Sequence, residues 1–143
     1  MKKFEFSLQK MQRYKQQILD KEKALLAALQ NKRDRIQNQI TGLEAFLVEQ
    51  SHELQARQAK GMNAAELAGH NFIVQNTRTR LEDLRLELLN AEKELEEQRK
   101  IVMQASQEVK SIDKLEEKQL EEYQLEASRA ENEERMEMLT MTK

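Results

Sequence analysis

The sequence predicts an all-α protein, a long two-helix antiparallel coiled-coil hairpin forming a single coiled-coil domain over residues 1–143. Charged residues make up 35% of the chain and aromatic residues 4%, so a narrow helical seam suits it better than a compact core. Apolar residues recur at heptad spacing, which argues against disorder. The one stretch that would interrupt a helix is "KGMNAAELAGHNF" at 60–72, in a chain without proline.

The first predicted helix covers residues 4–58. Most of its apolar residues fit one heptad frame: Phe4, Leu8, Met11, Ile18, Leu25, Leu29, Ile36 and Leu43. Lys15, Glu22 and Lys32 interrupt this frame. A second line then runs through Ile36, Ile40, Leu43, Leu47 and Leu54, which predicts a stutter near Gly42.

The predicted turn covers residues 59–63. Gly61 can take the left-handed conformation that closes a helix. Asn63 can cap the next helix by accepting from the N–H of Glu66, whose side chain can reach back to it. Because so short a connection favours antiparallel neighbours, the two helices should form a hairpin.

The second predicted helix covers residues 64–138 and carries the clearest heptad. Its first positions are Leu67, Val74, Leu81, Leu88, Leu95, Val102 and Val109, which predicts a coiled-coil seam. In the hairpin Phe4 should lie near Gln119, and 123–139 should overhang the first helix. Residues 1–41 are basic, with ten Lys/Arg and four Asp/Glu. They would lie beside residues 113–137, which are acidic, with four Lys/Arg and ten Asp/Glu. One continuous helix in a parallel dimer is the rival architecture, and we expect a monomer.

Composition excludes several classes of function. The net charge of −2 provides no basic field for nucleic acid. The longest apolar run has six residues, whereas a membrane span needs about 20. Without a signal-peptide pattern or any Cys, we expect a soluble protein of the cytoplasm.

The sequence holds no pattern that indicates catalysis. It lacks the glycine-rich motifs that bind phosphate groups, and a two-helix rod has no enclosed pocket that could shift the pKa of a carboxylate. His52 and His70 are too few to form a metal site. We therefore expect no enzyme activity, cofactor or metal.

Two regions remain as candidate contact surfaces. Phe46 and Phe72 lie off both heptad lines toward the turn, where they could anchor a partner or pack locally. Met136, Met138 and Met141 lie near the C-terminus, where they could make an adaptable apolar contact or belong to a disordered end.

Both ends of the chain resemble the flagellar export protein FliJ family and its relatives in type III secretion. The start, "FEFSLQKMQRYKQQILDKEKALLAAL" at 4–29, is similar to the family's F-x-L opening followed by a charged helix. The finish, "KSIDKLEEKQLEEYQLEASRAENEERMEML" at 110–139, is similar to its charged segment with an acidic, Met-containing end. Gly61 falls where the family turns, whereas Ser111-Ile112-Asp113 departs from the commoner pattern.

The resemblance implies a non-enzymatic stalk, similar to the rotor stalk of rotary ATPases, in flagellar assembly and hence in motility and chemotaxis. Its implied partners are the hexameric export ATPase, the export gate membrane protein and export chaperones, at the inner face of the cell membrane at the flagellar base. Positions that match the gate-contacting surface are Leu43, Phe46, Gln50 and Phe72. For the ATPase ring we expect contacts by the overhang, through Glu131, Glu133, Glu134, Met136, Glu137 and Leu139.

Two other functions fit a helical hairpin: a chaperone that holds clients between its arms, and a passive spacer. Exposed apolar residues at the tip would favour the chaperone. Because the tip at 58–66 is polar, it argues against that function.

Overall fold

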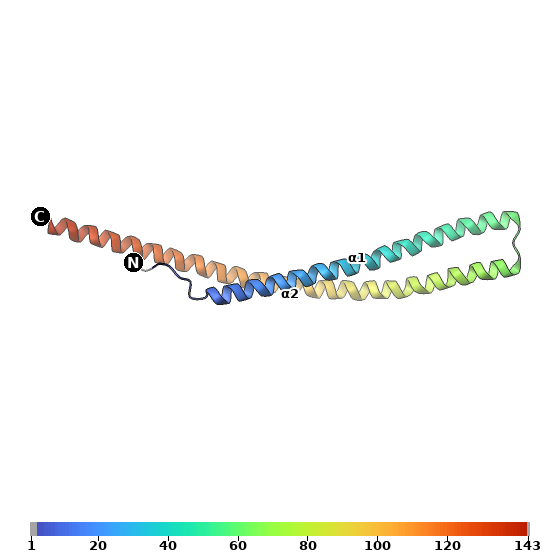
Figure 1. Ribbon diagram of the computed structural model, residues 1–143, viewed down its shortest axis with the longest axis horizontal. Helices are drawn as coiled ribbons and strands as arrows, with labels where there is room; N and C mark the ends of the chain where they lie inside the picture. Colours follow the sequence, from blue (N-terminus) through green and yellow to red (C-terminus); the bar gives the residue numbers. More distant parts are fainter. Residues whose placement is uncertain (1–2, 143) are drawn as a thin grey trace. The chain divides into compact units, whose positions relative to one another are not determined.

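The computed structural model describes residues 3–142, and this part of the chain is all-α. Helix α1 covers Gln9–Lys60 and helix α2 covers Ala64–Met141. The two helices follow one another with a short turn between them and pack as an antiparallel pair (Figure 1). The predicted two-helix hairpin is therefore confirmed. No helix in the described part is both long and apolar enough to cross a membrane.

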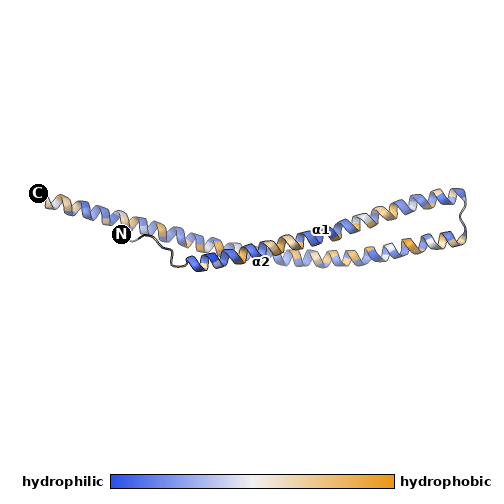
Figure 2. Ribbon diagram, viewed as in Figure 1, coloured by the Kyte–Doolittle hydropathy of each residue, from blue (hydrophilic) through white to orange (hydrophobic). Residues whose placement is uncertain are grey.

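The hairpin divides into two units, which we describe separately. The turn unit is Ala24–Arg99, and the terminal unit combines Met1–Lys23 with Lys100–Lys143. Both units contain a segment of α1 and a segment of α2. Figure 2 shows hydrophobic positions recurring along both helices between hydrophilic ones, as a narrow apolar seam requires.

The connection between the helices forms as the sequence predicts. Gly61 has a φ of 95°, which L side chains rarely adopt, and it follows the last residue of α1. The Asn63 Oδ1 accepts from the backbone N–H of Glu66 at 2.8 Å, which caps α2. The Glu66 carboxylate in turn accepts a hydrogen bond from the side-chain amide of Asn63 at 3.4 Å.

The start of α1 differs from the prediction, because the helix begins at Gln9 and not at residue 4. Residues 3–6 are non-helical, and the Phe6 side chain is buried. The Phe4 ring lies 5.5 Å from the Tyr123 ring between centroids, about one helical turn beyond the expected neighbour Gln119. This non-helical start accommodates both the ring contact of Phe4 and the burial of Phe6.

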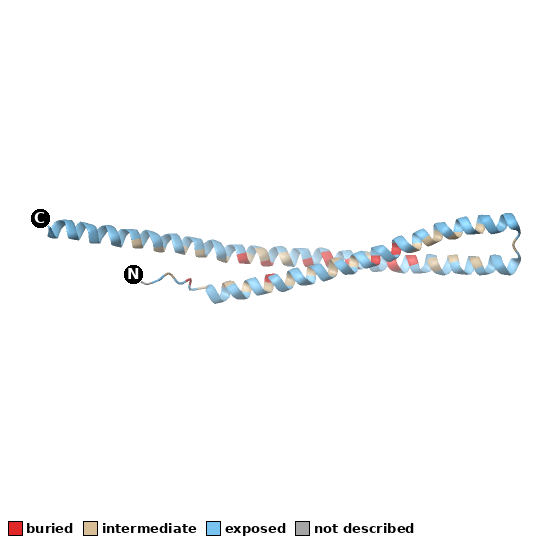
Figure 3. Ribbon diagram, turned by 45° about the horizontal axis from the view of Figure 1, so that its top comes forward, coloured by how far each residue is buried: buried red, intermediate tan, exposed pale blue. Residues whose placement is uncertain are grey.

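Each unit has its own small core (Figure 3). The turn unit buries Ile36, Ile40, Leu81, Leu84 and Ala91, with Leu43, Leu47 and Leu88 packed against them. The terminal unit buries Leu19, Ala105 and Val109, with Ile18 and Val102 against them. The heptad predicted for the second helix is confirmed in its central part, where Leu81, Leu95 and Val109 are buried and Leu88 and Val102 are partly buried.

The register predicted for the first helix is wrong in part. Met11 and Leu25 are about half exposed and lie beside the seam. The least exposed positions of α1 run without interruption at alternating steps of three and four, so there is no stutter: 12, 15, 19, 22, 26, 29, 33, 36, 40, 43, 47, 50 and 54. Polar residues occupy several of these positions, Lys15 and Glu22 among them. Two of the polar residues, Gln12 and Lys15, bond across the seam to Asp113 and Glu108.

Candidate partner-binding surfaces

Polar bonds join the two helices within each unit. In the terminal unit, Lys15 Nζ donates to Glu108 Oε2 at 2.9 Å and the Gln12 amide donates to Asp113 at 2.8 Å. The Lys15 and Gln104 hydrogen bonds, with the charge of Lys15, lower the pKa of Glu108 below its ordinary value of 4.5.

Two exposed ion pairs cross between the helices in the turn unit. Lys32 pairs with Glu94 at 3.6 Å and Arg85 with Glu44 at 3.4 Å. Because basic groups on one helix meet acidic groups on the other in both units, these bonds support the antiparallel pairing.

The C-terminal end of α2 is the most exposed part of the terminal unit. Every residue from 128 to 142 is exposed, although the segment is helical to Met141. Within the described part of the chain, no ion pair involves Glu131, Glu133, Glu134 or Glu137. These carboxylates therefore remain available to a basic partner.

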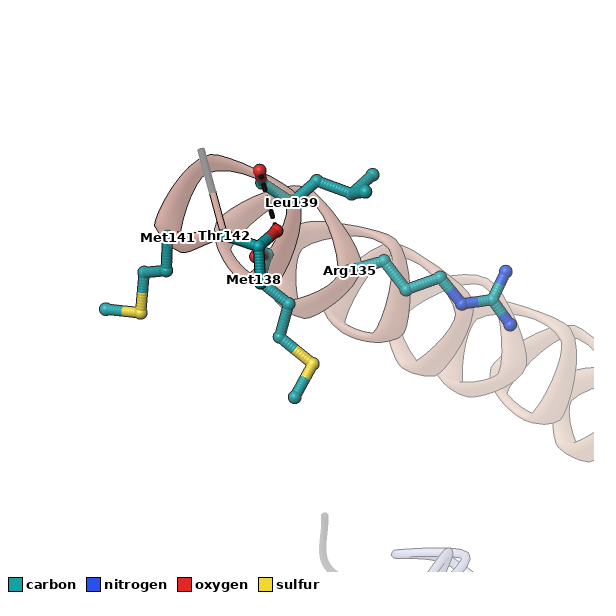
Figure 4. Close-up of a pocket in the computed structure, with 5 residues that line it drawn as sticks. All are labelled: Arg135, Met138, Leu139, Met141 and Thr142. Atoms are coloured by element: carbon teal, nitrogen blue, oxygen red, sulfur yellow. Dashed lines mark hydrogen bonds between the residues drawn. The ribbon is translucent and has the colours of Figure 1, made fainter.

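The last two turns of α2 carry an exposed apolar cluster. Met136, Met138, Leu139 and Met141 are 67%, 71%, 62% and 87% exposed. In Figure 4 the side chains of Met138, Leu139 and Met141 project from the helix into open space, while Arg135 points back along it. Thr140 and Thr142 hydroxyls bond to carbonyls of the preceding turn, at 2.9 Å to Met136 and to Met138. The two hydroxyl groups are therefore satisfied within the helix, whereas the apolar side chains are exposed to solvent.

The four residues matched to a gate surface all lie in the turn unit, but they differ in environment. Leu43 is partly buried against the core. Phe46 and Gln50 are also partly buried, and the Gln50 amide donates to Glu53 at 3.4 Å. Phe72 is 68% exposed. Among the described aromatic residues, the one ring contact joins Phe4 and Tyr123, so none brings Phe46 to Phe72.

A shallow groove in the terminal unit lies outside the two candidate contact surfaces that the sequence predicts. Its lining residues come from both helices: Ile18, Glu22, Lys100, Ile101, Gln104, Ala105 and Glu108. The signal that could have identified it is the line Met11, Ile18 and Leu25, which was assigned to the seam itself.

The described part of the chain contains no group of side chains that could bind a metal ion. No three His, Cys, Asp or Glu side chains there gather closely enough to hold an ion. Every buried side-chain nitrogen or oxygen atom described has a partner, so no orphaned polar group marks a ligand site.

Fold and surfaces together define a two-helix antiparallel coiled-coil protein whose exposed acidic, apolar end is suited to contacts with other proteins. A family model, flagellar FliJ protein, matches residues 4–140. The chain belongs to this family, which makes it a structural component of the flagellar export apparatus. No curated protein and no solved structure matches the chain.

Proposed function

We propose that this protein is a stalk that inserts its C-terminal end into the ring of the flagellar export ATPase and promotes the ring's assembly and activity. The observation that carries the proposal is the exposed end of α2. Residues 128–141 form the last part of α2, which is fully exposed and is first acidic and then apolar. Isolated helices of this length are marginal in water, so a partner that encloses the segment would stabilise it.

The chemistry of the segment suggests how it would bind. Basic groups lining a ring could pair with Glu131, Glu133, Glu134 and Glu137, while an apolar collar could receive Met136 and Leu139. Methionine side chains adapt to irregular surfaces, so such a contact would tolerate turning or tilting of the stalk within the ring.

A second contact, with the export gate membrane protein, is favoured by the turn unit. Phe72 is a large aromatic residue exposed to solvent over 68% of its surface, and such residues often anchor interfaces. Leu43, Phe46 and Gln50 complete the proposed gate surface. We also propose that the hairpin cycles export chaperones and acts as a cytoplasmic monomer, held peripherally at the inner face of the membrane by these partners.

The decisive experiment measures ATP hydrolysis by the cognate export ATPase with the full chain and with a chain lacking residues 129–143. The truncation should leave the thermal midpoint almost unchanged, because the removed residues are exposed. It should abolish most of the stimulation. The stimulation by the full chain should also weaken as salt rises, since exposed charge pairs are screened.

A charge-only variant sharpens this test. Replacing Glu131, Glu133, Glu134 and Glu137 by Gln should reduce stimulation and its salt dependence. The control replaces four exposed carboxylates of the turn unit that belong to no ion pair: Glu49, Glu82, Asp83 and Glu92. Normal stimulation by the truncated chain would refute the ring contact and favour a passive spacer or a chaperone hairpin.

A further inference from the structure

An apolar line runs beside the seam in the terminal unit. Met11 and Ile18 contribute to it from α1, and Ile101 and Leu115 from α2. Met11, Ile101 and Leu115 are 49%, 48% and 37% exposed. Ile18 and Ile101 line one groove together with Ala105 of the core. Both helices therefore present their extra apolar residues on the same flank, which we call the apolar flank.

This pattern is wider than a two-stranded coiled coil needs. A two-helix seam uses two apolar positions in each heptad, whereas helices that face a bundle core use a third position beside them. Each helix of the terminal unit has two apolar residues at that third position. They are seven residues apart on α1, at Met11 and Ile18, and fourteen apart on α2, at Ile101 and Leu115. The opposite flank lacks such a line: its α1 positions Gln9, Gln16 and Lys23 are all polar. One side of the terminal unit is thus built to receive another helix.

The charges at the edges of the apolar flank indicate which kind of helix fits. Three exposed lysines lie along the flank: Lys21 and Lys118 by helical periodicity, and Lys100 in the lining of the groove. None of the three takes part in an ion pair within the described residues. The acidic residues that line the groove are already engaged, Glu108 by Lys15 at 2.9 Å and Glu22 by another interaction within the structure. The free charge beside the groove, from Lys21 and Lys100, is therefore positive, and the exposed Glu122 lies one heptad beyond Leu115 on the same line.

We infer that the apolar flank binds an acidic amphipathic helix of a partner protein, which would lie along the groove as a third strand of the coiled coil. Its apolar stripe would cover Met11, Ile101 and Leu115, and its carboxylates would meet the lysines beside the groove. A lipid surface fits less well, because its plane cannot follow the floor of a groove between two helices. The site is separate from the C-terminal end and from the turn unit, so the inference does not depend on the ATPase contact.

The test uses a fluorescein-labelled synthetic helix of three heptads with Leu at its seam positions and Glu beside them. Binding to the full-length protein is followed by fluorescence anisotropy. A counterpart with Lys in place of each Glu measures the charge preference. The acidic peptide should bind more tightly, and the double substitution Lys21→Glu with Lys100→Glu should reverse the preference.

Substitutions on the flank then locate the site. Ile101→Gln with Leu115→Gln should weaken binding of the acidic peptide by about tenfold or more, equivalent to about 1.4 kcal/mol. Both side chains are exposed, so helicity by circular dichroism should be unchanged. The matched control, Met103→Gln with Leu120→Gln, changes residues of similar exposure on other faces of α2 and should bind as the wild type.

Several outcomes would overturn the inference. Equal binding by the flank and control variants would show that the peptide binds elsewhere. Flank-dependent binding to phosphatidylglycerol vesicles without binding to the peptide would assign the flank to a membrane. If the protein alone sediments as a dimer that the flank substitutions dissociate, a second copy of this chain is the occupant.

Discussion

Lys15 and Glu108 bond across the terminal unit, with the Lys15 Nζ 2.9 Å from a carboxylate oxygen of Glu108. Both side chains are partly exposed, at 30% and 39%, and Lys15 stands at a seam position where an apolar residue is usual. The pair replaces an apolar layer with a charge-assisted hydrogen bond, which makes this layer sensitive to pH and salt.

The first prediction concerns pH. The folded pKa of Glu108 is depressed below 4.5 by the hydrogen bonds from Lys15 and Gln104 and by the charge of Lys15. A depressed carboxyl pKa contributes stability above the unfolded value, and that contribution is lost as pH falls through the folded value. Urea unfolding should therefore show Glu108→Gln less stable than wild type at pH 7, with the difference shrinking as pH falls from 4.5 through the lowered folded pKa. A difference that persists in acid would show that the side chain acts by packing.

Removal of a buried leucine should test the core of the turn unit. Leu84 is 1% exposed, whereas Leu86 on the same helix is 63% exposed. Leu84→Ala should cost about 2–5 kcal/mol in the free energy of unfolding. Leu86→Ala should change it by less than about 0.5 kcal/mol, as for most surface substitutions. Chemical denaturation of both variants measures the contrast, and equal costs would contradict the burial pattern.

Asn63 should matter through one hydrogen bond at the start of α2. Asn63→Ala removes the acceptor of the Glu66 N–H, a bond of 2.8 Å, and should cost about 1 kcal/mol. Asn63→Asp keeps an acceptor oxygen and adds a negative charge at a helix N-terminus, so it should retain the wild-type stability. A loss shared by both variants would point to the backbone conformation and not to the cap.

Substitution of the two phenylalanines of the proposed gate surface should affect the free energy of unfolding to different extents. Phe72→Ala removes a side chain that is 68% exposed and should leave the free energy of unfolding within about 0.5 kcal/mol of wild type. Phe46 is partly buried, so Phe46→Ala should cost more. If Phe72→Ala also destabilises the hairpin, that ring packs in solution and is no free anchor.

Much of the fold could be predicted from the sequence because each signal had one physical meaning. Gly61 and Asn63 mark the helix break by conformation and by capping. The seam of α2 shows in its regular apolar positions, Leu81 to Val109, because it admits few polar residues. These signals depend on neighbours in sequence and need no knowledge of the partner helix.

The register of α1 could not be predicted in the same way. Lys15 and Glu22 occupy seam positions that residue type argues against, and what satisfies Lys15 is Glu108, 93 residues away. Meanwhile Met11, Ile18 and Leu25 form an apolar heptad beside the seam and misled the assignment. The late start of α1 had a similar cause, since the ring of Phe4 packs against Tyr123, a contact that local sequence does not show.

The candidate contact surfaces were predictable to different extents. Exposure of Phe72 and of the C-terminal methionines accords with their positions off the heptad lines. Leu43, by contrast, fits a heptad line and packs against the core. Which partner covers each surface depends on groups outside this chain, and those contacts stay predictions.

The bond between Lys15 and Glu108 also helps to fix the register of the two helices. An apolar seam alone would let one helix slide by a heptad at little cost, because leucine would again meet leucine or valine. A slide of seven residues along α2 would place Lys15 opposite Ile101 or Leu115, the apolar residues one heptad on either side of Glu108. The ammonium group would then lose its acceptor, so the misaligned hairpin would be less stable than the correct one. A polar residue that weakens one layer of the seam thereby favours the correct alignment over one shifted by a heptad.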